Sequence, residues 1–148
     1  MQQIAKHIHY HLNTAQKTVI VPHQQADADA LGAATALFEY LQNRGRNAAI
    51  FCVTPKNSKL SFLPHSAELA TDPAIFAHPE VDTVIVVDSG DLRYAGIHQH
   101  LLGHKATIIN IDHHATNDHF GNINLVIPTA SSTCEILFNF FKHNHVAI

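Results

Sequence analysis

Residues 106–114 read Ala106-Thr107-Ile108-Ile109-Asn110-Ile111-Asp112-His113-His114, a mostly apolar run that ends in an aspartate and two histidines. Apolar and β-branched residues over this length predict a buried strand at 106–111. The three side chains that follow it would lie at the carboxyl end of that strand. Carboxylates and imidazoles bind metals and transfer protons, so these three residues are candidate functional groups.

Two further apolar runs end in the same way. The strand predicted at 18–21 leads into a turn with three candidate ligands, His23, Asp27 and Asp29. The strand predicted at 82–87 leads into Asp88-Ser89-Gly90-Asp91. Because the carboxyl ends of parallel strands share the sheet edge where ligands bind, we expect all these side chains to meet.

Helical and strand patterns alternate along the chain. Apolar spacing predicts helices at 2–16 and 29–43, a capping box predicts one that begins at Ser132, and 92–102 is a weaker candidate. Strands are predicted at 18–21, 47–53, 82–87, 106–111 and 122–127, with loops over most of 54–80. This alternation predicts an α/β fold: a three-layer sandwich with a mostly parallel sheet of about five strands and helices on both faces.

The composition fits one globular domain over 1–148, with 46% hydrophobic and 14% charged residues. The net charge of -3, without a lysine or arginine cluster, speaks against duplex binding but leaves a small or single-stranded phosphate substrate open. No apolar run has the length of a signal peptide or membrane span, which predicts a cytoplasmic protein without membrane contact. Cys52 and Cys134 imply neither a disulfide framework nor a zinc site.

Asp27 and Asp29 lie two residues apart in one turn, a spacing that suits two neighbouring cations. In two-metal phosphoryl chemistry the ions lie about 3.5 to 4 Å apart, activate a water and stabilise the leaving oxygen. Asp88 is placed to lie between the ions, with His23 at the first and His113 at the second. Mixed carboxylate and imidazole ligands suit Mn²⁺ better than Mg²⁺ or Ca²⁺.

The alternative interpretation of these carboxylates is structural. Asp29 could cap the helix that follows it, and Asp88 with Gly90 could form a turn. Such roles explain each residue singly. They do not explain three strand ends that all carry ligand-type side chains, and we therefore favour the metal site.

Four segments in order carry a resemblance to a known family. They are His23-x3-Asp27-x-Asp29-Ala30-Leu31-Gly32, Asp88-Ser89-Gly90-Asp91, Asp112-His113-His114, and Ala130-Ser131-Ser132-Thr133-x-Glu135. With them the chain resembles the DHH phosphoesterase superfamily over nearly all of its length. It is most similar to the branch of bifunctional oligoribonucleases and phosphoadenosine-phosphate phosphatases, and to the core of RecJ-type exonucleases.

The resemblance implies a role for each motif residue. One Mn²⁺ would be held by His23, Asp27 and Asp88 and the other by Asp29, Asp88 and His113, with Mg²⁺ as the alternative ion. His114 would contact the scissile phosphate, and Asp112 would orient its neighbours. The catalytic set would then be Asp88, His113, His114 and Asp112.

The chain departs from the family pattern twice. Family members usually have an aspartate, a further ligand of the second ion, where this sequence has Ile127. They also have a smaller carboxy-terminal substrate-binding domain, which this chain lacks. We therefore interpret residues 1–148 as an amino-terminal catalytic domain whose substrate site the missing domain would complete, and we expect impaired activity.

Further candidate substrate-binding residues are Ser132, Thr133 and Arg93. The first two, at a helix amino terminus, could bind phosphate through backbone N–H groups or serve only as a cap. Arg93 follows the second motif and is either a substrate contact or a surface charge. Lys56 and Lys59 lie in a loop, where a solvated surface is the simpler interpretation.

The predicted function is a Mn²⁺-dependent two-metal phosphoesterase that hydrolyses short single-stranded oligonucleotides or small nucleotide phosphates. One alternative is a degenerate domain that binds metal or nucleotide with little turnover. Another is a pyrophosphatase or polyphosphatase, against which the Ser-Ser-Thr-x-Glu form of the fourth motif speaks. The sequence leaves open whether the protein forms a homo-oligomer.

Overall fold

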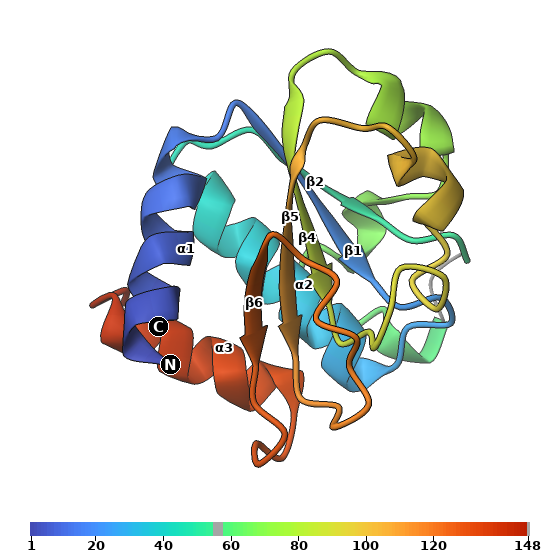
Figure 1. The fold of residues 1–148 in the computed structure, drawn as a ribbon. Coiled ribbons are helices and arrows are strands. Elements are labelled where there is room, and N and C mark those ends of the chain that lie inside the picture. Colours follow the sequence, from blue (N-terminus) through green and yellow to red (C-terminus); the bar gives the residue numbers. More distant parts are fainter. Residues whose placement is uncertain (55–57, 148) are drawn as a thin grey trace.

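The computed structural model describes residues 1–54 and 58–147, which form a layered α/β unit (Figure 1). Within them a sheet of six strands has the order β3-β2-β1-β4-β5-β6, and every pair of neighbours is parallel. The strands are β1 (Lys17–Pro22), β2 (Ala48–Phe51), β3 (Leu69–Ala70), β4 (Val81–Val87), β5 (Thr107–Asp112) and β6 (Ile123–Val126). Lys56 lies outside the described residues.

The α-helices cover one face of the sheet and short 3-10 helices cover the other. The helices α1 (Gln2–Thr14), α2 (Ala28–Gln42) and α3 (Thr133–His143) share the larger apolar cluster. The smaller cluster takes Phe76 and Leu101 from two of the 3-10 helices. Those two helices are η3 (Pro73–Ala77) and η4 (His98–Leu101), and the described residues also form the 3-10 helices η1 (Ser58–Leu60) and η2 (Ser66–Glu68).

The central strands are apolar on both sides because both faces of the sheet are covered. Along β4, Ile85 and Val87 belong to the larger cluster, whereas Val84 and Val86 belong to the smaller one. All four are fully buried. Each such side chain contributes about 1.5–3 kcal/mol on transfer from water, so the two clusters hold the strand in one register.

The predicted fold class is confirmed, with differences in detail. The predicted strands all form, and the described residues add a sixth, β3, in a segment expected to consist of loops. Two residues of β3 pair with β2, too few to leave a periodic pattern in the sequence. The weak helix expected at 92–102 is a series of turns that ends in η4. Among the described residues, no helix is long and apolar enough to cross a membrane.

Candidate metal centre

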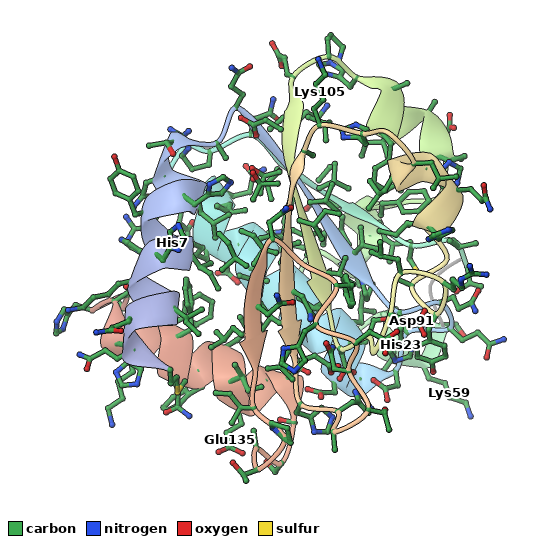
Figure 2. All side chains as sticks on the ribbon, viewed as in Figure 1. His7, His23, Lys59, Asp91, Lys105 and Glu135 are labelled. Carbon is green, nitrogen blue, oxygen red and sulfur yellow. The ribbon has the colours of Figure 1, made fainter. Side chains whose placement is uncertain are left out.

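The candidate centre lies where the strand order of the sheet reverses, between β1 and β4. In open parallel sheets this switch point leaves a crevice at the carboxyl ends of the strands, where ligands bind. His23 follows β1, Asp88 follows β4, and Asp112 is the last residue of β5. Figure 2 shows His23 and Asp91 at this end of the sheet and Lys105, which precedes β5, at the opposite end.

Asp27, and not Asp29, caps helix α2. The Oδ1 atom of Asp27 accepts hydrogen bonds from the backbone N–H groups of Asp29 at 2.9 Å and Ala30 at 3.0 Å. The Asp29 carboxylate is thereby left to reach across to α3, where its two oxygens accept from the N–H groups of Thr133 and Cys134, both at 2.8 Å. The alternative interpretation of Asp29 as the cap of α2 is therefore wrong: Asp29 accepts from the first two N–H groups of α3, which fixes this carboxylate beside His113.

Asp88 lies between the two imidazoles. Its Oδ2 atom is 3.8 Å from His23 Nε2, and its Oδ1 atom is 3.5 Å from His113 Nε2. A second carboxylate approaches each imidazole: Asp27 Oδ1 lies 3.9 Å from His23 Nε2, and Asp29 Oδ2 lies 3.8 Å from His113 Nε2. The structure thus brings together all five predicted metal ligands, with one oxygen of Asp88 facing each side.

The hydrogen bonds of the two imidazoles decide which ring nitrogen carries the proton. His23 Nδ1 lies 2.7 Å from the carbonyl oxygen of Gln24, and His113 Nδ1 lies 3.4 Å from that of Ala130. A carbonyl can only accept, so each Nδ1 is the donor. In the neutral rings the lone pair on Nε2 then faces carboxylate oxygens, an arrangement that is repulsive without a cation.

The spacing of these ligand atoms fits shared cations. Atoms that coordinate one ion at about 2.1 Å are roughly 3 to 4 Å apart. The gaps of 3.5–3.9 Å around the two Nε2 atoms lie within that range. Within the described residues, two groups have ligand atoms close enough to share an ion: His23, Asp27 and Asp88, and Asp88, His113 and His114. The first group is the predicted one, whereas the second contains His114 where the resemblance implies Asp29, although Asp29 Oδ2 also approaches His113 Nε2. The residues present therefore fit two cations.

Burial makes the centre electrostatically unfavourable in the absence of positive charge. Asp88 is 2% exposed, and burial raises the pKa of its carboxyl group, as do the charges of Asp29 and Asp27. The Thr133 hydroxyl, which donates to Asp88 Oδ1 at 2.9 Å, and His23 oppose this effect. For Asp29, burial raises the pKa, but hydrogen bonds from Cys134 and Thr133 with the charge of His113 lower it overall.

The backbone of Asp88 is itself constrained. Its φ of 57° lies in the left-handed region, which aspartate and asparagine tolerate better than most residues. Its N–H donates to the Ile111 carbonyl on the neighbouring strand at 3.0 Å. Such conformations persist where the surroundings enforce them, and they are frequent at functional sites.

Asp112 positions His114 and is fully buried. Its Oδ1 atom accepts from the N–H of His113 at 2.8 Å and from His114 Nδ1 at 2.7 Å. The hydrogen bond from His114 to Asp112 raises the pKa of that imidazole, although partial burial lowers it. Because Nδ1 of His114 is used in this way, only Nε2 remains for a substrate. The position of Asp112 agrees with the orienting role implied by the resemblance.

Three asparagines support Asp112, and none of them was among the candidate residues predicted from the sequence. Asn117 Nδ2 donates to Asp112 Oδ2 at 2.6 Å, and Asn110 Nδ2 donates to Asn117 Oδ1 at 2.8 Å and to Asn124 Oδ1 at 3.0 Å. We call Asn110, Asn117 and Asn124 the asparagine ladder. Its signal in the sequence was Asn110 itself, because a polar residue inside an apolar strand needs buried partners.

The fourth motif supports the carboxylates directly. Thr133 is fully buried and uses its N–H and its hydroxyl on Asp29 and Asp88. Ser132 Oγ accepts from the Glu135 N–H at 3.0 Å, so Ser132 is the cap predicted for α3. Glu135 in turn accepts from the N–H and the hydroxyl of Ser131. These groups hold the site together.

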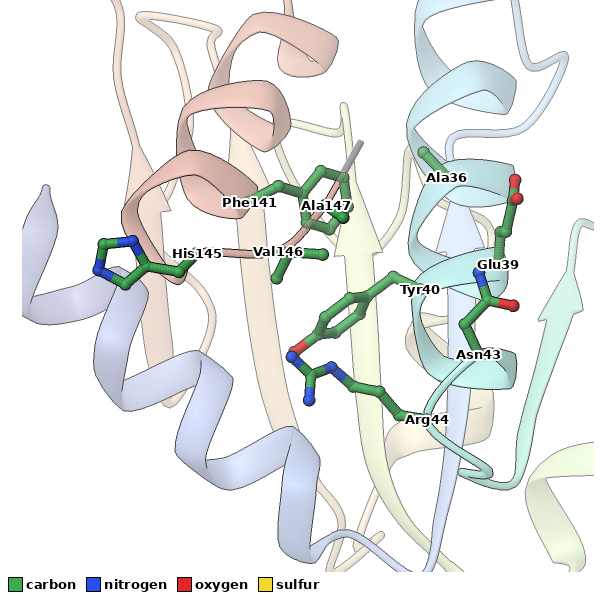
Figure 3. Close-up of a pocket in the computed structure, with 9 residues that line it drawn as sticks. All are labelled: Ala36, Glu39, Tyr40, Asn43, Arg44, Phe141, His145, Val146 and Ala147. Carbon is green, nitrogen blue, oxygen red and sulfur yellow. The ribbon is translucent and has the colours of Figure 1, made fainter.

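The remaining candidates from the sequence are Arg93, Lys59 and position 127. Arg93 is exposed in the turn after β4, and Lys59 lies on η1. Ile127 is partly buried and packs against the larger apolar cluster. A separate pocket between α2 and the end of α3 contains no candidate site residue (Figure 3).

The fold, and the side chains at the carboxyl ends of its strands, define the class of the protein. It is an α/β domain with a candidate centre for two cations at the switch point of its sheet. Residues 17–147 match the model of the DHH family, N-terminal domain. The chain belongs to the DHH family, as its four motifs predicted.

Two curated relatives match most of this chain. It is 31% identical over 119 residues to the bifunctional oligoribonuclease and PAP phosphatase NrnA of Thermus thermophilus, covering 80% of this chain and 34% of that protein. It is 28% identical over 135 residues to the probable bifunctional oligoribonuclease and PAP phosphatase NrnA of Streptococcus mutans, covering 90% of this chain and 41% of that protein. The chain therefore spans well under half the length of these relatives.

Among solved structures, the fold is similar to that of an exopolyphosphatase-related protein from Bacteroides fragilis. The TM-score is 0.87 at 24% identity, and the match covers 96% of this chain and 44% of that one. At this level of identity the likeness concerns the fold.

Asn117→Leu tests the asparagine ladder. The variant removes the amide partner of Asp112, Ser89 and Asn110 in a buried place. We expect the free energy of unfolding to fall by about 2–4 kcal/mol, because buried polar groups lose their partners. Urea denaturation measures this. Asn43→Ala, at an exposed asparagine, should change it by less than about 0.5 kcal/mol. Equal effects of the two variants would contradict the ladder's role.

Asp88→Asn tests the electrostatics of the centre. Asparagine tolerates the left-handed backbone and can still accept from Thr133. Without metal, at pH 7, we expect the variant to be more stable than the wild type, because the raised pKa of Asp88 means that ionisation destabilises the fold. This advantage should disappear below the ordinary aspartate pKa of about 3.9, where the carboxyl group is neutral. Thermal unfolding in chelator at several pH values measures it, and a variant less stable at pH 7 would refute the argument.

Proposed function

We propose that this protein is a phosphoesterase dependent on two divalent cations, and that it hydrolyses short oligonucleotides or small nucleotide phosphates. One observation supports this above the others. The two oxygens of the Asp88 carboxylate face two imidazoles whose Nδ1 atoms donate to backbone carbonyls, so that both Nε2 lone pairs point at the space beside Asp88. A bridging carboxylate between two imidazoles is suited to a pair of cations rather than to one.

We assign the first cation to His23, Asp27 and Asp88, and the second to Asp29, Asp88 and His113. When bound, such ions supply Lewis acidity, which activates water and stabilises charge on phosphate oxygens. The mixture of oxygen and imidazole ligands favours Mn²⁺ over Mg²⁺. Thr133 and the amino end of α3 hold Asp29 and Asp88 in place for this role.

His114 is the substrate-facing group in this proposal. Its side chain is 46% exposed, and the hydrogen bond to Asp112 fixes its ring while Nε2 stays free. A protonated Nε2 can donate to a phosphate oxygen, or pass its proton to the leaving oxygen as the ester bond breaks. Asp112 favours the protonated ring, and the asparagine ladder holds Asp112. His114 thus needs no contact with a cation to take part.

The substrate class follows from chemistry and from the relatives. Three carboxylates at the centre would repel a polyanion, so the cations must be present before a phosphate compound can bind. Both curated relatives are named as bifunctional oligoribonuclease and PAP phosphatase. These names describe activity on oligoribonucleotides and on the phosphate compound PAP, and we extend that substrate class to this chain. Arg93, exposed next to the centre in sequence, is a further proposed contact to phosphate.

The experiment is hydrolysis of a labelled dinucleotide by the full chain with Mn²⁺. We expect release of mononucleotides, loss of activity in chelator, and recovery when Mn²⁺ is restored. Asp88→Asn should lower the rate by roughly 10³-fold or more. Asp72→Asn should not change it, since Asp72 is exposed and its cap on η3 can be kept by asparagine.

Two outcomes would contradict this proposal. Calorimetry that shows Mn²⁺ binding without any hydrolysis would favour a degenerate binding domain. Cleavage of pyrophosphate or polyphosphate without cleavage of nucleotides would favour a phosphatase of inorganic chains.

A further inference from the structure

One aromatic ring at the rim of the candidate centre has no role in the proposal above. Tyr94 lies in the turn after β4, and its ring stacks on the imidazole of His23 with ring centroids 5.1 Å apart and an interplanar angle of 24°. Tyr94 is 48% exposed, whereas His23 is 7% exposed. The imidazole is therefore covered, while much of the tyrosine ring is open to solvent.

Hydrogen bonds fix the backbone that carries this ring, and stacking on His23 orients the ring itself. The N–H of Tyr94 donates to Asp91 Oδ1 at 2.7 Å, and its carbonyl accepts from the N–H of Gln24 at 3.2 Å. The turn that carries Tyr94 is thus tied to the turn that carries His23. Because the ring is held before any ligand arrives, stacking on it would require little further ordering of the protein.

A second exposed apolar side chain lies beside the same turns. Val53, which follows β2, is 41% exposed. It lies against Gly96, where a Cβ atom would come within 2.5 Å of Val53 Cγ2 and 3.6 Å of Gln24 Oε1. The rim next to the carboxylates therefore combines an aromatic ring and an aliphatic group. Such a border suits a ligand with a charged part and a flat apolar part.

We propose that Tyr94 stacks against the nucleobase of the substrate, beside the cation held by His23. This inference rests on the proposed function and narrows its substrate class to compounds with a base. The Tyr94 ring stacks directly on His23, which is a proposed ligand of that cation. A nucleotide with its phosphate at the cation could therefore place its base on Tyr94, with the sugar between the two. A bare phosphate chain has no flat face and would gain nothing from this ring.

A supporting role for Tyr94 is the competing explanation. If the ring only shields His23, its removal should weaken the binding of every phosphate compound to the same extent, whether or not the compound has a base. If the ring stacks a base, the loss should fall on base-containing compounds alone. Stacking of one base on an aromatic side chain corresponds to about 5- to 150-fold in affinity. The two explanations therefore differ by an amount that calorimetry resolves.

The test compares adenosine 5′-monophosphate with ribose 5-phosphate, both titrated into the full chain with saturating Mn²⁺. We expect the wild type to bind the nucleotide at least about tenfold more tightly. Tyr94→Leu should bring the two affinities close together, and Tyr94→Phe should keep most of the difference. Tyr10→Leu is the matched control, because Tyr10 is 71% exposed on α1 and away from the centre in the fold.

The outcomes separate this inference from the proposed function, because binding is measured without turnover. Equal affinity of the wild type for both compounds would overturn the stacking role even if dinucleotides are hydrolysed. A base preference that Tyr94→Leu leaves intact would also overturn it, as would an equal loss for both compounds. A preference that depends on Tyr94, in a protein without hydrolytic activity, would support the stacking role and refute the phosphoesterase.

Discussion

The placement of one buried carboxylate between two imidazoles organises the rest of this structure. Asp88 leaves β4 with a left-handed backbone, and its N–H is bonded to β5 while its side chain is bonded to α3. Any change in the packing of β4 against β5, or of α3 against the sheet, would move it. The packed core therefore holds residues from four separate segments at distances suited to shared cations. The distances between the ligand atoms depend on the register of the strands in the sheet.

Much of this arrangement could be predicted from sequence because it depends on local patterns. The strands around Val84 and Ile109 are apolar runs covered on both faces, and parallel sheets bring their carboxyl ends to one edge. That logic is sufficient to bring His23, Asp88 and His113 together. It does not decide which aspartate caps α2, because Asp27 and Asp29 are equivalent in the local pattern. The difference between them is the contact of Asp29 with Thr133 on α3, which is 104 residues away in the chain.

The groups that the sequence did not reveal act through long-range hydrogen bonds. Asn117 lies in a loop, where asparagine is common and carries no pattern, yet it bonds both Asp112 and Asn110. Gly121 belongs to the same structure, since a Cβ there would lie 2.8 Å from the Ile123 carbonyl oxygen and 3.0 Å from Asn124 Oδ1. Tyr94 lies in a turn without a local pattern that marks it, and only the fold brings its ring onto His23. Each of these depends on tertiary packing that no local rule contains.

The strand order also determines which strands have backbone groups free to pair with another molecule. The run Val81–Val87, rich in β-branched residues, is the kind of segment that forms intermolecular fibrils when its backbone is free to pair. Here it lies in the middle of the sheet, bonded on both sides to β1 and β5. The edge strands are β3, with two residues, and β6, with four residues. Pro128 follows β6 closely. Edge strands this short offer a second molecule little free backbone for strand pairing, so the topology itself limits edge-to-edge pairing of sheets.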